Sequence, residues 1–335
     1  MLRSGAQGLF ELADASQVGE CRRAAQALAT SFGFDAPAAG RVAIVTSELA
    51  ANVVRHGGGG YLLLQPLRDG GPLIEVLAVD RGPGMADVDR CLHDGYSTAG
   101  TSGNGLGAVR RLSQVFDVHS APGRGTVVLA RIGGEARATP SARDTFDIGT
   151  VCIALRGEIE CGDGWAIATQ ATGLALVLID GLGHGAAAAS ATALGLAVFE
   201  RHAELAPAAL MARLHEGMAA SRGAAVACAW LSAAGGVQYA GVGNIAGCMA
   251  TLERSRGMLS HNGIIGSRLP RFQELTYEWP AEAAFVLHSD GVGNRWSMRE
   301  HPGLLRCHPA VIAATLHRDH GRASDDATVI VVKRP

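Results

Sequence analysis

The sequence predicts an α/β (α+β) protein of two domains: a layer of helices on a mixed or antiparallel β-sheet, followed by a strand-rich α/β sandwich. Its 335 residues exceed the length at which a single hydrophobic core keeps growing. Residues 136–145 are small and polar, include a proline and show no apolar periodicity, as expected of a linker. We therefore predict a first domain at 1–135, a linker at 136–145 and a second domain at 146–335.

Each domain has its own pattern of apolar residues. In the first, we predict helices at 16–31, 37–56 and 108–116, and strands at 9–12, 61–66, 73–80 and 126–132. In the second, we predict helices at 186–205 and 207–220, and strands at 150–155, 165–169, 174–179, 224–231, 237–241, 284–288 and 328–332. Many strands with few helices indicate an α/β sandwich.

Composition excludes several classes of protein. The net charge of −2 offers no broad basic surface, so we expect no nucleic-acid partner. Seven cysteines without a Cys-x-x-Cys pair predict neither a disulfide framework nor a zinc site, and are typical of a reducing compartment. No basic stretch followed by a long apolar run opens the chain, and the apolar segment 186–199 is too short to span a bilayer. We expect a cytoplasmic protein without membrane contact.

One helix of the first domain carries two polar residues beside its apolar face. At about 100° per residue, Glu48 and Asn52 lie one turn apart on the shoulder of the apolar stripe of 41–56. A carboxylate and an amide left unpaired there would cost on the order of a few kcal/mol. They are either capped or solvated helix residues, or part of a polar site.

Glycine-rich turns follow this helix in an order that favours a site. Strand 73–80 leads into Asp80-Arg-Gly-Pro-Gly84, residues 100–107 read Gly-Thr-Ser-Gly-Asn-Gly-Leu-Gly and enter a helical pattern, and Gly-Arg-Gly-Thr126 comes later. Glycines at a strand-to-helix turn let backbone N–H groups approach a polyphosphate, and a helix N-terminus adds its positive end. In this order within one domain, the motifs predict a nucleotide site.

These residues resemble the GHKL ATP-binding superfamily of gyrase, heat-shock chaperone and histidine-kinase ATPase domains, over about residues 9–131. The most similar branch is that of the anti-sigma-factor serine kinases. The resemblance implies ATP bound with Mg²⁺ on Asn52, an adenine amino group on Asp80, and Glu48 as the catalytic base that orients an acceptor hydroxyl. It further implies nucleotide contacts by Gly82, Gly84, Gly103, Gly105, Gly107 and Thr126.

Four aspartates of the second domain stand at strand ends in glycine-rich or polar segments: Asp163, Asp180, Asp290 and Asp325. A single Asp-Gly is usually a turn. Four such turns that converge from strands of one fold predict a site for hard divalent cations, because carboxylate oxygens are the ligands such ions prefer. Two cations together activate water and neutralise a phosphoryl group.

The same segments are similar to those of the PPM-type serine/threonine phosphatases, in particular the bacterial stage-II sporulation and stress-response branch, from about residue 146 to 332. The resemblance implies an α-β-β-α sandwich and two Mn²⁺ or Mg²⁺ ions. Their ligands would be Asp163, Asp180, the Gly181 carbonyl, Asp290 and Asp325, with Asp326 as a second choice. Asn294 stands where relatives carry a further aspartate, Arg222 is a candidate phosphate ligand, and His184 packs or caps a turn.

Both resemblances together imply a partner-switching regulator in bacterial stress or sigma-factor signalling. It would phosphorylate and dephosphorylate a STAS-type antagonist protein on Ser or Thr. One alternative is a phosphatase whose N-terminal domain binds nucleotide or a partner without transferring phosphate. Another is an anti-sigma factor that acts by sequestration. Fold-level analogy does not separate these three.

Overall fold

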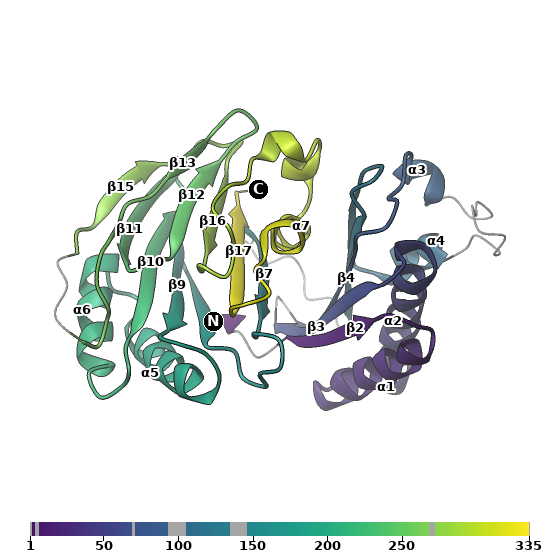
Figure 1. Ribbon diagram of the computed structural model, residues 1–335, viewed down its shortest axis with the longest axis horizontal. Coiled ribbons are helices and arrows are strands. Elements are labelled where there is room, and N and C mark those ends of the chain that lie inside the picture. The colour runs from purple at the N-terminus through teal and green to yellow at the C-terminus, as the bar shows by residue number, and fades with distance from the viewer. Residues whose placement is uncertain are drawn as a thin grey trace. The chain divides into compact units, whose positions relative to one another are not determined.

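The computed structural model describes residues 2–3, 7–68, 71–92, 105–134, 146–267 and 272–334. The chain forms two compact units, Gln7–Ser141 and the combination of Met1–Ala6 with Ala142–Pro335 (Figure 1). The expected linker at 136–145 and Gly103 lie outside the described residues. Strand β1 (Leu2–Arg3) pairs with strand β8 (Asp163–Gln170), so the start of the chain belongs to the second of these units.

The first unit is a layer of helices on one face of an antiparallel sheet (Figure 1). The strands lie in the order β2 (Gly8–Leu12), β3 (Gly60–Arg68), β4 (Pro72–Asp80), β6 (Thr126–Gly133) and β5 (Val115–Ser120). The helices are α1 (Ser16–Ser31), α2 (Ala36–Gly57), α3 (Val88–Cys91) and α4 (Gly105–Leu112). The predicted helix layer is confirmed, and the sheet, expected to be mixed or antiparallel, is antiparallel in each of its described pairings.

Helix α2 is long because its sequence supplies both ends and a continuous apolar stripe. The Asp35 side chain caps the first turn by accepting a hydrogen bond from the Ala38 amide, with a proline at the start of the helix. Gly58 ends the helix in the left-handed conformation, with φ of 67°. The stripe packs on the sheet through Val42, Val45, Leu49 and Val53. This leaves Glu48 and Asn52 at the edge of the core.

The helical stretch expected at 108–116 is wrong in its second half. Helix α4 ends at Leu112, and residues 115–120 form strand β5 beside β6. The Gln114 amide already donates to the Arg131 carbonyl of β6, at 2.8 Å. Pairing with a neighbouring strand overrides the local helical pattern here because it buries the same apolar residues and also satisfies the backbone.

The second unit consists of two packed sheets with helices on both outer faces. One sheet has the order β1, β8, β9 (Gly173–Gly181), β10 (Ala224–Ser232), β11 (Gly236–Val242) and β14 (Ser260–His261), with β15 (Leu275–Glu278) also on β11. The other has the order β13 (Ser255–Gly257), β12 (Ala246–Ala250), β16 (Ala284–His288), β17 (Ala327–Lys333) and β7 (Asp147–Ile153). Helices α5 (Ala186–His202) and α6 (Pro207–Gly217) cover the first sheet, and α7 (Pro309–His320) covers the second.

The inner faces of the two sheets form one core. Trp165, Leu176 and Leu178 of the first sheet share it with Phe285 and Ile330 of the second. Together with the outer helices, this arrangement confirms the predicted α-β-β-α sandwich.

Sequence patterns do not predict α7, although Pro309 occupies its first turn and the His308 imidazole accepts from the Ala310 amide. Residues 309–316 are buried on every side, so the helix shows no polar face by which its period could be recognised.

Candidate functional site

Glu48 and Asn52 of α2 lie beside the N-terminus of α4. A methyl group built on Gly105, the first residue of α4, would lie 3.0 Å from Glu48 Oε2 and 3.8 Å from Asn52 Nδ2. Backbone N–H groups at the start of a helix point out of it and attract anions. The structure therefore places a carboxylate, an amide oxygen and a helix N-terminus around one point.

A second cluster of polar groups surrounds the Asp80 carboxylate at the end of β4. Its Oδ1 accepts from the Gly82 amide at 2.8 Å and from the Thr126 amide at 3.1 Å. The Thr126 hydroxyl in turn lies 2.9 Å from that of Ser120. These bonds hold the Asp-x-Gly turn against the start of β6, so Asp80, Gly82 and Thr126 come together as the sequence predicts.

Glycines let this turn approach the end of α2. A side chain on Gly82 would place its first carbon 2.7 Å from Cα of Gly57 and 2.8 Å from the His56 carbonyl oxygen. Gly84 has φ of 68°, a conformation that other residues rarely adopt. Helix α2 thus runs past both polar groups, with Glu48 and Asn52 near α4 and its last turn beside Asp80. Gly107 is buried within α4.

In the second unit, Asp163 and Asp180 face each other across a strand pair. They are register partners at one end of β8 and β9. The Ser289 hydroxyl donates to Asp163 Oδ2 at 2.6 Å and accepts from the Thr328 amide at 2.9 Å. Because Ser289 directly follows β16 and Thr328 lies in β17, this pair of bonds joins the two sheets at the aspartates.

Asp290 follows the end of β16, and Asp325 lies between α7 and the start of β17. The Asn244 side chain donates to Asp290 Oδ2 at 2.6 Å, and Asp325 Oδ1 accepts from the Asp326 amide at 2.9 Å. Sequence analysis did not single out Asn244, which shows no local motif. Asp326 differs from its neighbour, because its two oxygens accept from the amides of Leu155 at 2.8 Å and Gly162 at 3.0 Å. It holds backbone in place.

The aspartates repel one another. Burial raises the pKa of Asp163 to about 7 and that of Asp180 to about 8, and the neighbouring carboxylates add to both shifts. The pKa of Asp290 is raised by burial and by the charge of Asp325. The carboxylates are thus close enough for their charges to interact, and a cation bound among them would relieve the repulsion.

These donors fit a divalent metal centre. They are anionic oxygens, the ligands that Mg²⁺ and Mn²⁺ prefer. Gly181 lets the backbone after Asp180 pass close to α5, because a side chain there would place its first carbon 2.5 Å from the Ala188 carbonyl oxygen. The residues present can therefore hold hard cations at the ends of β8 and β9.

The raised pKa values predict how stability depends on pH in chelator. The folded protein binds protons at Asp163 and Asp180 more tightly than the unfolded chain, whose aspartates titrate near 3.8. The free energy of unfolding should therefore fall as pH rises from about 4 to about 8. Thermal unfolding in chelator across this range measures the slope, which Asp163→Asn should reduce. A slope unchanged by Asp163→Asn would contradict the prediction.

Other residues singled out by the sequence lie near this centre or on the surface. The Arg222 guanidinium donates to the Leu182 carbonyl at 2.8 Å, so it lies beside the turn that follows Asp180. His184 pairs with Glu158, with Nδ1 and Oε1 2.7 Å apart. Asn294 is exposed.

Comparison with known proteins identifies both units. The family described as "Histidine kinase-like ATPase domain" matches residues 12–132, and "Stage II sporulation protein E (SpoIIE)" matches residues 170–335. The serine/threonine-protein kinase RsbT of Bacillus subtilis (strain 168) is 34% identical over 110 residues, which are 83% of that protein and 32% of this chain. The chain belongs to the histidine kinase-like ATPase family. Over residues 170–335, its second unit is similar to the SpoIIE family.

Two solved structures are similar in fold to part of this chain. A structure entitled "The bacterial stressosome: a modular system that has been adapted to control secondary messenger signaling" is 26% identical, with a TM-score of 0.53, and covers 57% of this chain and 100% of its own. RsbX in complex with magnesium shares the fold at 19% identity and a TM-score of 0.50, over 58% of this chain and 98% of that one. No helix within the described parts of the chain has the length and apolar character needed to cross a membrane.

Proposed function

We propose that the chain is a bifunctional partner-switching regulator. Its first unit transfers phosphate from ATP to a Ser or Thr of a STAS-type antagonist protein, and its second unit removes such phosphates. One observation carries the proposal: a single chain brings together Glu48 and Asn52 at a helix N-terminus in one unit, and converging aspartates in the other. The similarity to a protein named as a serine/threonine kinase supports the first half.

In the kinase half, each residue has a separate task. The N-terminus of α4 binds phosphate oxygens, and the Asn52 amide oxygen holds the Mg²⁺ that accompanies ATP. Asp80, already fixed by two backbone amides, accepts the adenine amino group. Glu48 lies beside the phosphate-binding helix end, where it can take the proton of the attacking hydroxyl.

In the phosphatase half, the carboxylates hold the metal ions. Asp163, Asp180, Asp290 and Asp325, with the Gly181 carbonyl, hold two divalent cations. When bound, such cations activate water and neutralise the phosphoryl group. Ser289 keeps Asp163 oriented, and Asn244 does the same for Asp290. Asp326 fixes the loops of Leu155 and Gly162 around the centre and leaves metal binding to its neighbours.

The test uses the intact chain with a purified STAS-domain protein, ATP and Mg²⁺ or Mn²⁺, and follows phosphate by mass spectrometry. We expect phosphate to appear on the STAS protein with ATP, and to be lost from the phosphorylated form when ATP is withheld. If ATP binds but no phosphate is transferred to any STAS protein tried, the first unit is a regulatory module instead. If chelator leaves dephosphorylation unchanged, the metal-dependent half of the proposal is wrong.

A further inference from the structure

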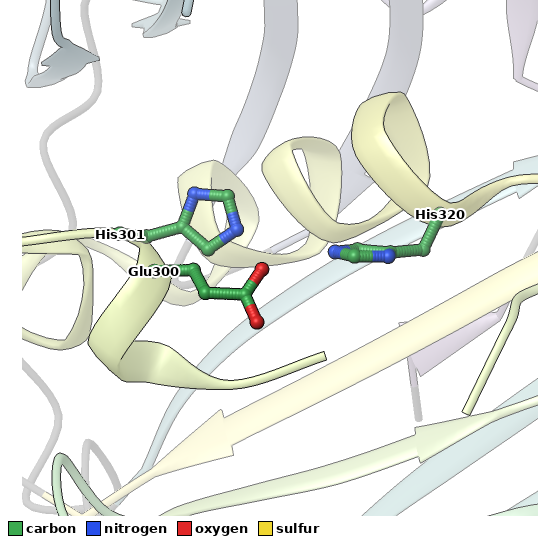
Figure 2. A group of neighbouring side chains, drawn as sticks. All are labelled: Glu300, His301 and His320. Carbon is green, nitrogen blue, oxygen red and sulfur yellow. The ribbon is translucent and has the colours of Figure 1, made fainter. Parts of the chain in front are cut away.

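Three potential metal ligands converge in the second unit outside the aspartate centre. Glu300 ends the short 3₁₀ helix η1 (Met298–Glu300), His301 follows it, and His320 is the last residue of α7. One carboxylate oxygen and one nitrogen from each imidazole all lie within 4.8 Å of one another. Figure 2 shows the three side chains directed toward a common space. Of the residues that the structure describes, only these three form such a group.

The two histidines of this group are largely shielded from water. His301 is 2% exposed, and Nε2 of His320 is buried without a hydrogen-bond partner. A buried polar nitrogen that lacks a partner destabilises the fold, and a bound ion would supply that partner. The exposed Glu300 carboxylate brings a negative charge to the two rings, and so completes a set that neutralises much of the charge of a divalent cation.

A further carboxylate, that of Asp319, lies beside the His301 ring. Asp319 Oδ2 is 3.8 Å from His301 Nδ1, and both Asp319 oxygens accept from the Arg318 guanidinium at 2.8 Å. Carboxylates beside ligating histidines are the usual outer-sphere partners of metal sites, where they orient the ring. Arg318 is itself buried, so Asp319 is held in a defined position.

The donor types select a different metal from that of the aspartates. Two imidazole nitrogens and one carboxylate oxygen suit Zn²⁺, which accepts three protein ligands and a water in tetrahedral geometry. Mg²⁺ prefers the oxygen-only ligands of the aspartate centre. The cysteine pattern used to exclude zinc does not bear on a site built from histidines. Glu300 and His320 are also too far apart in sequence to form a recognisable motif.

The position of the group gives it a structural role. The segment that leads from Asp290 to η1 runs beside the segment between His320 and Asp325. The Gly293 amide donates to the His320 carbonyl at 2.9 Å, and the Arg322 amide donates to the Gly291 carbonyl at 2.7 Å. An ion bound by the three side chains would add a second connection between the segments that carry Asp290 and Asp325.

We propose that Glu300, His301 and His320 form a Zn²⁺ site that fastens the turn at η1 to the end of α7, separate from the aspartate centre. The ion stabilises the two segments on which Asp290 and Asp325 are carried. This site stands on its own residues and does not depend on the proposed kinase and phosphatase activities.

The test titrates Zn²⁺ into the intact chain in excess Mg²⁺, by calorimetry and by thermal unfolding. We expect one tightly bound Zn²⁺ per chain and an unfolding midpoint that rises by several degrees. Glu300→Gln and His320→Gln should each weaken Zn²⁺ binding by at least about tenfold. His202→Gln, which changes the last residue of α5 as His320→Gln changes that of α7, should leave binding unaltered.

Two further variants show whether the Zn²⁺ is bound by the histidine group and whether the altered protein still folds. Asp180→Asn damages the aspartate centre, so tight Zn²⁺ binding that survives it belongs to the histidine group. Glu300 is exposed, so Glu300→Gln is expected to fold, which circular dichroism checks. Equal Zn²⁺ affinity in the parent, Glu300→Gln and His320→Gln would overturn the proposal. So would loss of the tight site in Asp180→Asn with retention in His320→Gln.

Discussion

Asp180→Asn is expected to lower the rate of dephosphorylation of a phosphorylated STAS protein by about a thousandfold, because metal-ion catalysis contributes several kcal/mol to the transition state. Burial raises the pKa of Asp180, and the charges of four other aspartates add to the shift. Asparagine retains the shape but removes the negative charge that holds the cations. Phosphorylation by the first unit should persist in this variant.

The measurement compares single-turnover dephosphorylation by the parent and the variant over a range of Mn²⁺ concentrations, with a chelator control. Asp147→Asn serves as the matched variant, because Asp147 is exposed at the start of β7 in the same unit. It should react as fast as the parent. An Asp180→Asn protein that keeps the parental rate at limiting Mn²⁺ would return this aspartate to an ordinary turn residue.

Glu48→Gln is expected to slow phosphate transfer to a STAS protein by about 10²- to 10⁴-fold while ATP still binds, since only the proton acceptor is lost. Asn52→Ala should instead weaken the binding of ATP with Mg²⁺, because the metal ligand is removed. The two residues lie one turn apart on α2 and both face Gly105. A loss of transfer in one variant and a loss of ATP binding in the other would therefore distinguish the base from the metal ligand.

Transfer is followed by mass spectrometry of the STAS protein, and ATP binding by calorimetry. Glu20→Gln provides the control, because Glu20 is exposed on α1 and should have no effect on either quantity. Equal transfer rates in the parent and Glu48→Gln would remove the assignment of the base. Unchanged ATP affinity together with unchanged transfer in Asn52→Ala would do the same for the metal ligand.

Local patterns sufficed for elements with one buried and one solvated face. Helix α2 shows its apolar stripe, its capping aspartate and its terminal glycine in consecutive sequence, so its ends could be predicted closely. The same reasoning failed for β5, whose conformation depends on β6, and for α7, which is buried on every side. Where a neighbouring strand or complete burial decides the conformation, the spacing of apolar residues no longer indicates whether the segment is a helix or a strand.

Residue types predict the chemistry that we propose for the aspartate centre, because carboxylate oxygens are the ligands that hard cations prefer. The resemblance ranked Asp325 above Asp326 as a ligand, but the local patterns gave no physical reason for the difference. That distinction arises when Asp326 accepts from the amides of Leu155 and Gly162, which are 171 and 164 residues away in the sequence. Its oxygens are then occupied by backbone, whereas Asp325 lies close enough to raise the pKa of Asp290.

The order of motifs along the chain predicts two α/β units, a nucleotide site and a carboxylate metal site, since each motif lies within one turn or one strand end. The structure forms two compact units, and the two sites stay predictions. Folding alone brought Asn244 to Asp290, Ser289 to Asp163, and Glu300 with His301 to His320. These contacts join separate elements, and no local propensity encodes them. They form because packing two sheets and their helices leaves only certain polar groups able to satisfy one another.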